Sequence, residues 1–179
     1  MKFAKGFTLI ELMVGIAVMG IMLTVAIPSF SEWVVKMRVD NEISSMHRLI
    51  LTARNSAVNS GLPVIVCPLS GKDCTDTWSN QVSAFIDAND NDQYDVATDT
   101  IIRVKDAVNT GDNLEYPNDS LIYRPTGRAG NTGTFVYCPK GHTDKNRSIT
   151  TSTFGRAYTS SDTDGDGKDE KRDGSEPSC

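Results

Sequence analysis

The sequence predicts an α+β protein in which a long, bent N-terminal helix packs on an antiparallel β-domain. Two changes of pattern along the chain carry this prediction. Apolar residues form an almost continuous run over residues 7–27 and then recur at helical spacing to about residue 59. Beyond Gly61 they occur in short β-rich runs between turn residues, without alternating helices. The 179 residues suffice for one domain and an appendage.

The first element, residues 7–27, predicts a membrane-spanning helix. Its 21 residues carry one formal charge, at Glu11, and a helix of this length crosses a hydrocarbon core of about 30 Å. No signal-peptidase pattern follows the run, so we expect the span to be retained. Lys2 and Lys5 precede it, which predicts a cytoplasmic amino end and an exported remainder.

An amphipathic continuation of the helix is expected over residues 28–60. Pro28 removes a backbone hydrogen bond, which predicts a bend where the helix leaves the membrane. Polar and φ-permissive residues at 59–61 end the helix. Two apolar stripes follow the helical period, and we expect the second to pack on the sheet: Phe30, Val34 and Met37, then Val39, Ile43, Met46, Ile50, Ala53 and Ala57.

The β-domain is expected over residues 61–159, followed by an acidic C-terminal loop at 160–179. Its predicted strands are residues 62–67, 82–86, 100–104, 120–124, 133–138 and 147–153. The C-terminal loop has almost no residue suited to a core. We therefore expect it to be ordered only if another part of the protein holds it.

Four cysteines lie beyond the predicted span, which favours disulfides in an exported domain. They allow three pairings, and spacing alone does not choose among them. We favour Cys67 with Cys74, a short local loop, and Cys138 with Cys179, which would tie down the polar tail. The alternative is a zinc site that uses the spacing of Cys138 and His142, but the sequence contains only one such half-site.

The carboxylate of Glu11 stands at membrane depth, where an ionised group costs about 2.5 kcal/mol or more. Residues 7–27 contain no Lys, Arg or His, so the nearest cation would be a chain terminus created by a cut close by. Residues 5–28, KGFTLIELMVGIAVMGIMLTVAIP, resemble the leader of type IV pilins and type II secretion pseudopilins.

This resemblance implies that a prepilin peptidase removes residues 1–6 by cutting between Gly6 and Phe7 and that Phe7 becomes methylated. It also implies that Glu11 meets the terminal amine of a neighbouring subunit during assembly. The physics agrees, because an ammonium and a carboxylate attract strongly at low dielectric and each alone is penalised there.

The exported part resembles the GspH/FimT group of minor pilins and pseudopilins. The resemblance rests on the order of GLPVIVCP, AFIDANDNDQYD, LIYRPTGRAGNTGTFVYCP and a last strand that ends in FGRA. It implies a β-domain of two packed sheets and a structural subunit of a type IV pilus, assembled with other pilin subunits by an inner-membrane platform. A type II secretion pseudopilin is the alternative. The protein would sit in the inner membrane with a periplasmic domain and enter the pilus on assembly.

A second alternative is a DNA-binding minor pilin used in natural transformation. Some proteins similar to FimT bind DNA through Gly-Arg-x-Arg; Gly155 and Arg156 match this motif, and Tyr158 replaces the second arginine. Residues 124–156 hold six basic residues and one acidic residue, whereas residues 73–119 hold two basic and eleven acidic residues. The DNA-binding candidates are Arg124, Arg128, Lys140, Arg147 and Arg156. An ordinary solvated face is the simpler interpretation.

Residues 162–173, DTDGDGKDEKRD, have the alternating carboxylates of a calcium loop, with Gly167 at the turn. The candidate calcium ligands are Asp162, Asp164, Asp166, the carbonyl of Lys168, Glu170 and Asp173. A flexible acidic tail is the alternative. A weaker candidate offers Asp87, Asn89, Asn91 and Asp95 but has Asp92 at the glycine position, and a turn rich in Asx residues also explains it.

Catalytic motifs are missing from the sequence, so we expect a protein that is not an enzyme. His47 is in the predicted helix and His142 in a loop, and no nucleophile elbow, Walker loop or paired metal histidines occur. A single-span periplasmic sensor, a third alternative, would need neither the cut at Gly6 nor Glu11.

Overall fold

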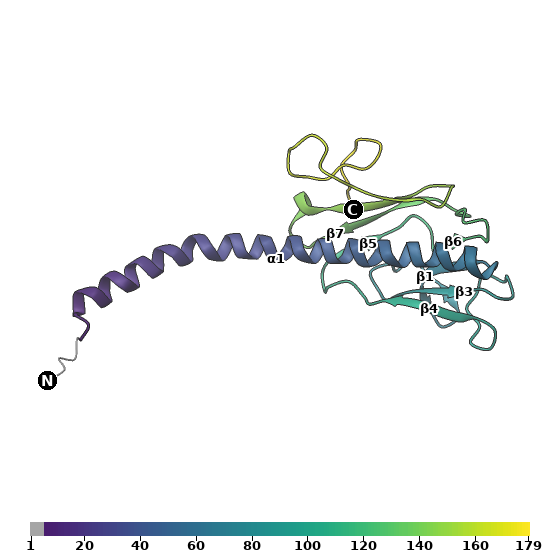
Figure 1. Cartoon of the computed structure of the whole chain (residues 1–179), viewed down its shortest axis with the longest axis horizontal. Helices are drawn as coiled ribbons and strands as arrows, with labels where there is room; N and C mark the ends of the chain where they lie inside the picture. The colour runs from purple at the N-terminus through teal and green to yellow at the C-terminus, as the bar shows by residue number, and fades with distance from the viewer. Residues whose placement is uncertain (1–5) are drawn as a thin grey trace. The chain divides into compact units, whose positions relative to one another are not determined.

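The computed structural model describes residues 6–179, except the side chains of Val25, Ala26 and Pro28. Most of the expected leader, residues 1–5, and the expected assembly role of the Pro28 side chain therefore lie outside the described residues. One α-helix precedes the strands (Figure 1). The elements are α1 (Leu9–Ser60), β1 (Val64–Ser70), β2 (Asp73–Cys74), β3 (Val82–Ile86), β4 (Thr100–Lys105), β5 (Asn113–Glu115), β6 (Leu121–Tyr123), β7 (Gly133–Cys138), a 3-10 turn η1 (Thr143–Lys145), β8 (Arg147–Thr151) and β9 (Ala157–Thr159).

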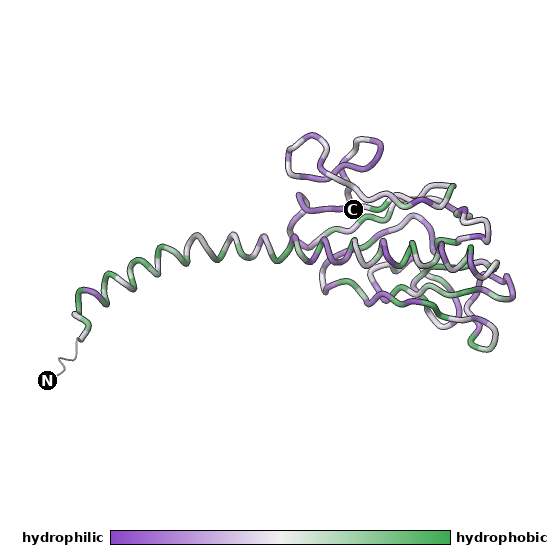
Figure 2. Tube along the Cα trace, viewed as in Figure 1, coloured by the Kyte–Doolittle hydropathy of each residue, from purple (hydrophilic) through white to green (hydrophobic). Residues whose placement is uncertain are grey.

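The chain forms two compact units. The first ends at Met37 and the second begins at Arg38. Within the first unit, α1 continues through Pro28 and follows a gradual curve (Figure 1), as the expected bent helix does. Proline has no N–H, so the carbonyl of Thr24 lacks its helical donor there. Figure 2 shows that this part of the helix is mostly hydrophobic, and by length and composition α1 is apolar enough to cross a membrane.

The second unit contains two antiparallel sheets, as expected. The first has the order β2-β1-β3-β4, with β6 also paired to β1, and the second has the order β5-β7-β8-β9. In the first sheet Val64 lies opposite both Ile86 and Tyr123. All six predicted strands occur, and two of them, β3 and β7, have the predicted bounds. The prediction missed β2, β5 and β9, which have two or three residues each and are too short to show an alternating pattern.

The C-terminal part of α1 belongs to this unit and supplies much of its core. The whole second apolar stripe, from Val39 to Ala57, is buried, with side chains no more than 6% exposed. Leu49, which the prediction did not include, is fully buried as well. The aromatic rings of Trp78, Tyr116 and Phe135 form the centre of another packed cluster, with Tyr116 stacked on Phe135 at a centroid distance of 3.9 Å.

Both expected disulfides are present. Cys67 is bonded to Cys74, and Cys138 is bonded to Cys179. The zinc alternative is therefore wrong, because a bonded Cys138 offers no thiolate to a metal. The second disulfide also answers what holds the polar C-terminal segment: it ties the last residue of the sequence to the end of β7.

A buried carboxylate joins α1 to the loop before β5. The side chain of Asp112 is fully buried and accepts hydrogen bonds from Arg38, the Tyr137 hydroxyl and the Lys140 N–H. Burial alone would raise the pKa of Asp112, but the hydrogen bonds from Tyr137 and Lys140 and the Arg38 charge outweigh it, so the pKa lies below the ordinary aspartate value. The ionised form is therefore part of the folded state.

This arrangement predicts how stability depends on pH. A depressed folded pKa contributes stability above the unfolded value of about 3.9, and that contribution is lost as the pH falls through the lower folded value. Asp112→Asn should lower the free energy of unfolding by about 3 kcal/mol at pH 7 and by much less in acid. Urea unfolding of the detergent-solubilised chain between pH 7 and pH 2 measures both effects.

Asp119→Asn serves as the control, because Asp119 is exposed and makes no side-chain hydrogen bond among the described residues. Parallel pH profiles for the wild type and Asp112→Asn would contradict the assignment.

Candidate functional site

The start of α1 holds the glutamate that the sequence analysis singled out. The Oε2 atom of Glu11 accepts hydrogen bonds from the N–H and the hydroxyl of Thr8, both at 2.9 Å. In return the Glu11 N–H donates to the Thr8 hydroxyl at 3.2 Å. This reciprocal pair is a capping box, which satisfies backbone donors at the helix start. Gly6 and Phe7 precede it and are exposed.

The capping box gives Glu11 a second role that the charge argument missed. The letters TLIE at residues 8–11 carry the Thr-x-x-Glu signature that would have revealed it. Its consequence is geometric, because Thr8 holds the carboxylate of Glu11 beside the first turn, four residues after Phe7, the first residue beyond the expected cut. An arriving amine would meet an oriented carboxylate rather than a freely rotating one.

A groove in the second unit gathers four arginines from distant parts of the sequence. We call it the arginine groove; it has a volume of about 610 Å³. Its lining residues are Arg54, Thr126, Arg128, Ser152, Phe154, Arg156, Tyr158 and Arg172, and no carboxylate is among them. A solvent-filled concavity with four guanidinium groups and no acid favours an anionic ligand.

Two turns form one end of this groove, and Arg54 joins them. From α1 its guanidinium donates to the carbonyl of Gly127 at 3.0 Å and to the carbonyl of Phe154 at 3.2 Å. The turns approach so closely that a Cβ at Gly155, which has φ +73°, would lie 2.0 Å from the Gly127 oxygen. Only glycine fits there, and its presence sets the positions of the flanking Phe154 and Arg156.

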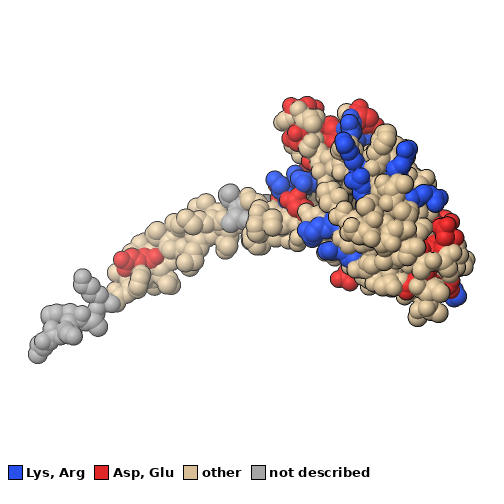
Figure 3. Space-filling model, turned by 45° about the vertical axis from the view of Figure 1, so that its right-hand side comes forward, with Lys and Arg blue, Asp and Glu red and all other residues tan. Residues whose placement is uncertain are grey.

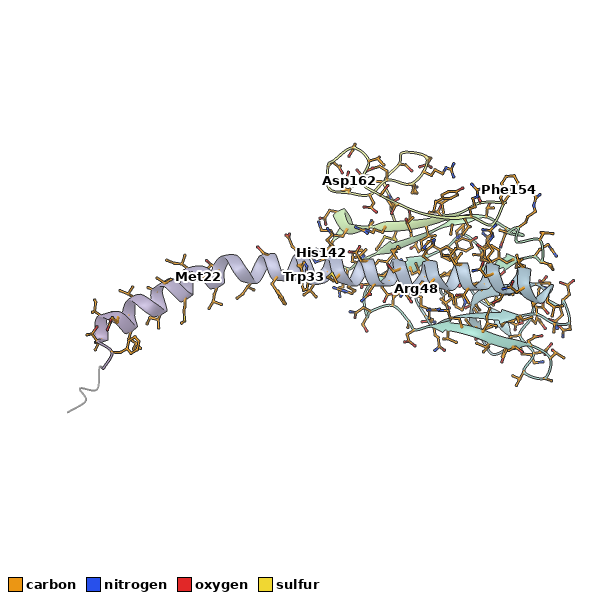
Figure 4. The ribbon with its side chains drawn as sticks, viewed as in Figure 1. Met22, Trp33, Arg48, His142, Phe154 and Asp162 are labelled. Atoms are coloured by element: carbon orange, nitrogen blue, oxygen red, sulfur yellow. A yellow bond between two sulfur atoms is a disulfide. The ribbon has the colours of Figure 1, made fainter. Side chains whose placement is uncertain are left out.

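Two arginine side chains in the groove lie over aromatic rings. Arg128 lies 5.3 Å from the ring centroid of Phe154, and Arg172 lies 4.3 Å from that of Tyr158. Arg156 and Arg172 lie next to the Tyr158 hydroxyl. Their hydrogen bonds, that of Arg156 first, lower the pKa of this hydroxyl. Phe154 is 65% exposed and lies on the turn between β8 and β9 (Figure 4).

The predicted DNA-binding residues divide into two groups. The structure brings Arg128 and Arg156 together in the arginine groove, whereas Arg124, Lys140 and Arg147 do not line it. Arg147 instead pairs with Asp40 at 2.6 Å and with Asp169 at 3.4 Å. The sequence analysis missed Arg54 and Arg172, because one lies in the helix and the other in the acidic tail. Only the fold brings them close.

The acidic loop places four of the expected calcium ligands around one point. One carboxylate oxygen from each of Asp162, Asp164, Asp166 and Glu170 lies within 4.8 Å of the others. The N–H groups of Gly165 and Gly167, both with positive φ, donate to Asp162 and curl the loop. Figure 3 shows acidic side chains on these uppermost loops, with basic side chains beside them. The donors are hard oxygens, which suit calcium.

The other two expected ligands are not part of this group. The Asp173 carboxylate accepts hydrogen bonds from the N–H and hydroxyl of Ser175 instead. At residue 168 the expected ligand is the main-chain carbonyl, which stays a prediction, while the Lys168 side chain forms an ion pair with Glu176 at 2.9 Å. The four grouped carboxylates are therefore the set of side-chain ligands that the structure supports.

The weaker candidate loop at residues 87–95 satisfies its own carboxylates. Asp87 is fully buried and accepts from the N–H groups of Asn91 and Asp92. Asp95 pairs with Lys72 and accepts from two asparagines, and these hydrogen bonds lower the pKa of Asp95 to about 2. Asp92 adopts φ 60°, the conformation that glycine would supply. A turn rich in Asx residues explains this loop.

Comparison with known proteins identifies the family. Residues 42–155 match the family described as type II transport protein GspH, which is more than half of the chain. The chain belongs to the GspH family. Residues 1–27 match the prokaryotic N-terminal methylation motif. Together these matches confirm the type IV pilin and pseudopilin superfamily that the sequence resembled.

Curated relatives of this GspH-family chain include pilus proteins. A fimbrial protein of Pseudomonas aeruginosa is 38% identical over 65 residues, 36% of this chain and 42% of that protein. Fimbrial protein Q of Moraxella bovis is 35% identical over 77 residues, 43% of this chain and 46% of that protein. The chain therefore spans less than half the length of the curated relatives it matches.

The crystal structure of the type IV minor pilin FimU from Pseudomonas aeruginosa shares the fold. The two chains have a TM-score of 0.51 and 19% sequence identity, and the match covers 70% of this chain and 91% of FimU. The GspH match ends at Gly155, so Arg156, Tyr158 and the C-terminal segment lie beyond the family-defining stretch.

Proposed function

We propose that this GspH-family protein is a minor pilin, a structural subunit of a type IV pilus, and not an enzyme. The observation that carries the proposal is the methylation-motif match over residues 1–27, which includes the apolar start of the long helix α1. Large apolar side chains such as Leu9, Ile10 and Met22 are more than 60% exposed (Figure 4). Such a surface needs lipid or neighbouring apolar helices to cover it.

In this proposal the helix anchors the protein in the inner membrane before assembly, with the β-domain in the periplasm. The two disulfides support this location of the β-domain, because disulfides persist in oxidising compartments such as the periplasm. Prepilin peptidase would cut after Gly6, and the assembly platform would pass the subunit to other pilins. Glu11 would then pair with the new amine of the adjacent subunit. A pseudopilin of a type II secretion system has the same architecture and remains the alternative.

Glu11→Ala should leave membrane insertion and leader cleavage unchanged and reduce incorporation into filaments at least tenfold, because a buried ion pair loses one partner. Sheared filaments quantified by immunoblot, with mass spectrometry of the amino terminus, measure both outcomes. The matched control is Glu32→Ala, which removes an exposed glutamate from the same helix. The mature chain should begin at methylated Phe7. Normal incorporation of Glu11→Ala, or an intact leader in functional filaments, would overturn the proposal.

We also propose that the acidic loop binds calcium through Asp162, Asp164, Asp166 and Glu170. Four carboxylates this close repel one another, and a divalent cation removes that repulsion. Adding a chelator should lower the melting temperature of the protein. Asp166→Asn should abolish this response, because Asp166 belongs to the four-carboxylate group. Asp173→Asn should preserve it, because the Asp173 carboxylate accepts hydrogen bonds from Ser175 and lies outside that group.

Differential scanning calorimetry with calcium or chelator measures the effect. Equal melting temperatures in both conditions would contradict the calcium proposal.

The arginine groove favours a second function, capture of DNA. Its four arginines lie together although the whole chain has a net charge of −5. Local charge decides such binding, because physiological salt screens charges more than about 8 Å away. A DNA-binding minor pilin for natural transformation would use this groove, which contains the Arg156 of the partly matched motif.

Arg128→Gln should weaken binding of an oligonucleotide and reduce the slope of log K against log salt by roughly 0.7 to 0.9. Fluorescence anisotropy of the detergent-solubilised chain measures the slope. Arg103→Gln is the matched control, because Arg103 is an exposed arginine on β4 outside the groove. If the wild type fails to bind at low salt, the DNA function is excluded.

A further inference from the structure

The C-terminal segment, residues 160–179, contributes a side chain to the arginine groove. Arg172 is part of the groove lining and covers the ring of Tyr158. Among the described residues, the segment's backbone contacts of β type are the pairing of Ser161 with Glu170 and one hydrogen bond from the Ser160 N–H to the carbonyl of Ser148 in β8. Its position must therefore be set by a few local contacts and by the disulfide at its end.

The noncovalent contacts that hold the segment are few. The Asn146 amide donates to the carbonyl of the buried Pro177 at 3.1 Å. Asp169 accepts from the hydroxyl of Ser160 and contacts Arg147. The contact of Arg172 with Tyr158 is a cation–π contact at the surface, which is individually weak. Every residue that becomes ordered loses backbone entropy, so a few weak contacts do not order a segment of this length.

The Cys138–Cys179 disulfide supplies the missing constraint. Its two cysteines are 41 residues apart in sequence, and closing a loop of that size removes much of the conformational freedom of the unordered chain. The bond starts from the end of β7, a strand paired on both sides within the second sheet. A rigid strand thus anchors the segment that carries Arg172.

The chemistry of the completed groove narrows its ligand class. With Arg172 present, the groove contains two guanidinium groups over aromatic rings, Arg128 over Phe154 and Arg172 over Tyr158. Arginine binds phosphates, and guanidinium planes stacked on aromatic rings, together with the exposed ring of Phe154, offer flat surfaces for unpaired bases, which a duplex hides in its stack. Single-stranded nucleic acid offers both groups at once.

We propose that the Cys138–Cys179 disulfide controls the affinity of the arginine groove for single-stranded nucleic acid by holding Arg172 over Tyr158. This inference rests on the DNA-binding function proposed above. Without the disulfide the protein keeps Arg54, Arg128 and Arg156 in place, because α1 carries Arg54, and Arg54 holds the two turns that carry Arg128 and Arg156. It loses the half of the groove built on Tyr158.

The test uses the full chain in detergent, with a chelator present so that no bound metal orders the acidic loop. The probe is a fluorescent single-stranded oligothymidine, and a duplex of the same length is the comparison. Arg172→Gln and Cys179→Ser should each weaken single-strand binding about tenfold, the size of one charged contact. Duplex binding should change less, because it uses the phosphate contacts alone.

The double variant distinguishes this mechanism from a general loss of stability. If the disulfide acts through Arg172, Cys179→Ser should add little to the loss already caused by Arg172→Gln. Arg103→Gln should leave single-strand binding unchanged. If Cys179→Ser does not fold, Asn146→Ala removes the tether to Pro177 and leaves both cysteines in place. It should produce a smaller loss in the same direction.

Three outcomes separate failure of this inference from failure of the function beneath it. A wild type that binds neither probe at low salt overturns both. A wild type that binds, together with a weakened Arg128→Gln and an unchanged Cys179→Ser, overturns only the role of the disulfide. Additive losses in the double variant also overturn it, because the disulfide would then act elsewhere.

Discussion

Burial of one face of the C-terminal part of α1 is the constraint on which the rest of the β-domain depends. Along this face the side chains from Val39 to Ala57 are almost completely withdrawn from solvent. Small residues at Ala53 and Ala57 let the backbone approach the sheets closely. The polar residues beside this stripe then contact strand ends and loops of the β-domain. The contacts are Arg38 with Asp112, Asp40 with Arg147, Glu42 with Lys105, and Arg54 with the carbonyls of Gly127 and Phe154. The helix therefore positions the loops that carry the candidate sites as well as the core.

The same helix has a different physical character in its first part. Residues 9–37 expose large apolar side chains, each of which stabilises by about 1.5–3 kcal/mol when it leaves water. No water-soluble state would tolerate so many, so lipid or neighbouring helices must cover them. Glu11 is the one ionisable residue in residues 9–27, and its capping box with Thr8 reconciles a carboxylate with a helix start. One residue can thereby serve helix initiation in a single subunit and charge pairing between subunits.

Sequence periodicity predicted the elements whose residues bury a face over several turns or several strand positions. The helix ended at Ser60, within a residue of expectation, and the β-rich runs that became β3 and β7 were short and flanked by polar or turn residues, so their bounds could be predicted. The cysteine pairing that we favoured, on the grounds of a short local loop and the need to hold the tail, is the one that the structure has. Very short strands such as β5 gave no period, because their burial comes from neighbours distant in sequence. The arginine groove was half predicted for the same reason: Arg128 and Arg156 lie near each other in a basic stretch, whereas Arg54 and Arg172 belong to segments of other character.

The C-terminal segment shows how far local chemistry can depart from composition. It is acidic overall, yet it delivers Arg172 to the most basic concavity described in the protein. The acidic group at Asp162, Asp164 and Asp166 is held on its own loop by backbone N–H groups, so its charge is confined to one place. The GspH match ends at Gly155, so Arg54 and Arg128 lie within the matched stretch, whereas Tyr158 and Arg172 lie beyond it. The groove thus combines side chains from the matched stretch with side chains that follow it, and the Cys138–Cys179 disulfide makes the C-terminal segment part of the folded domain.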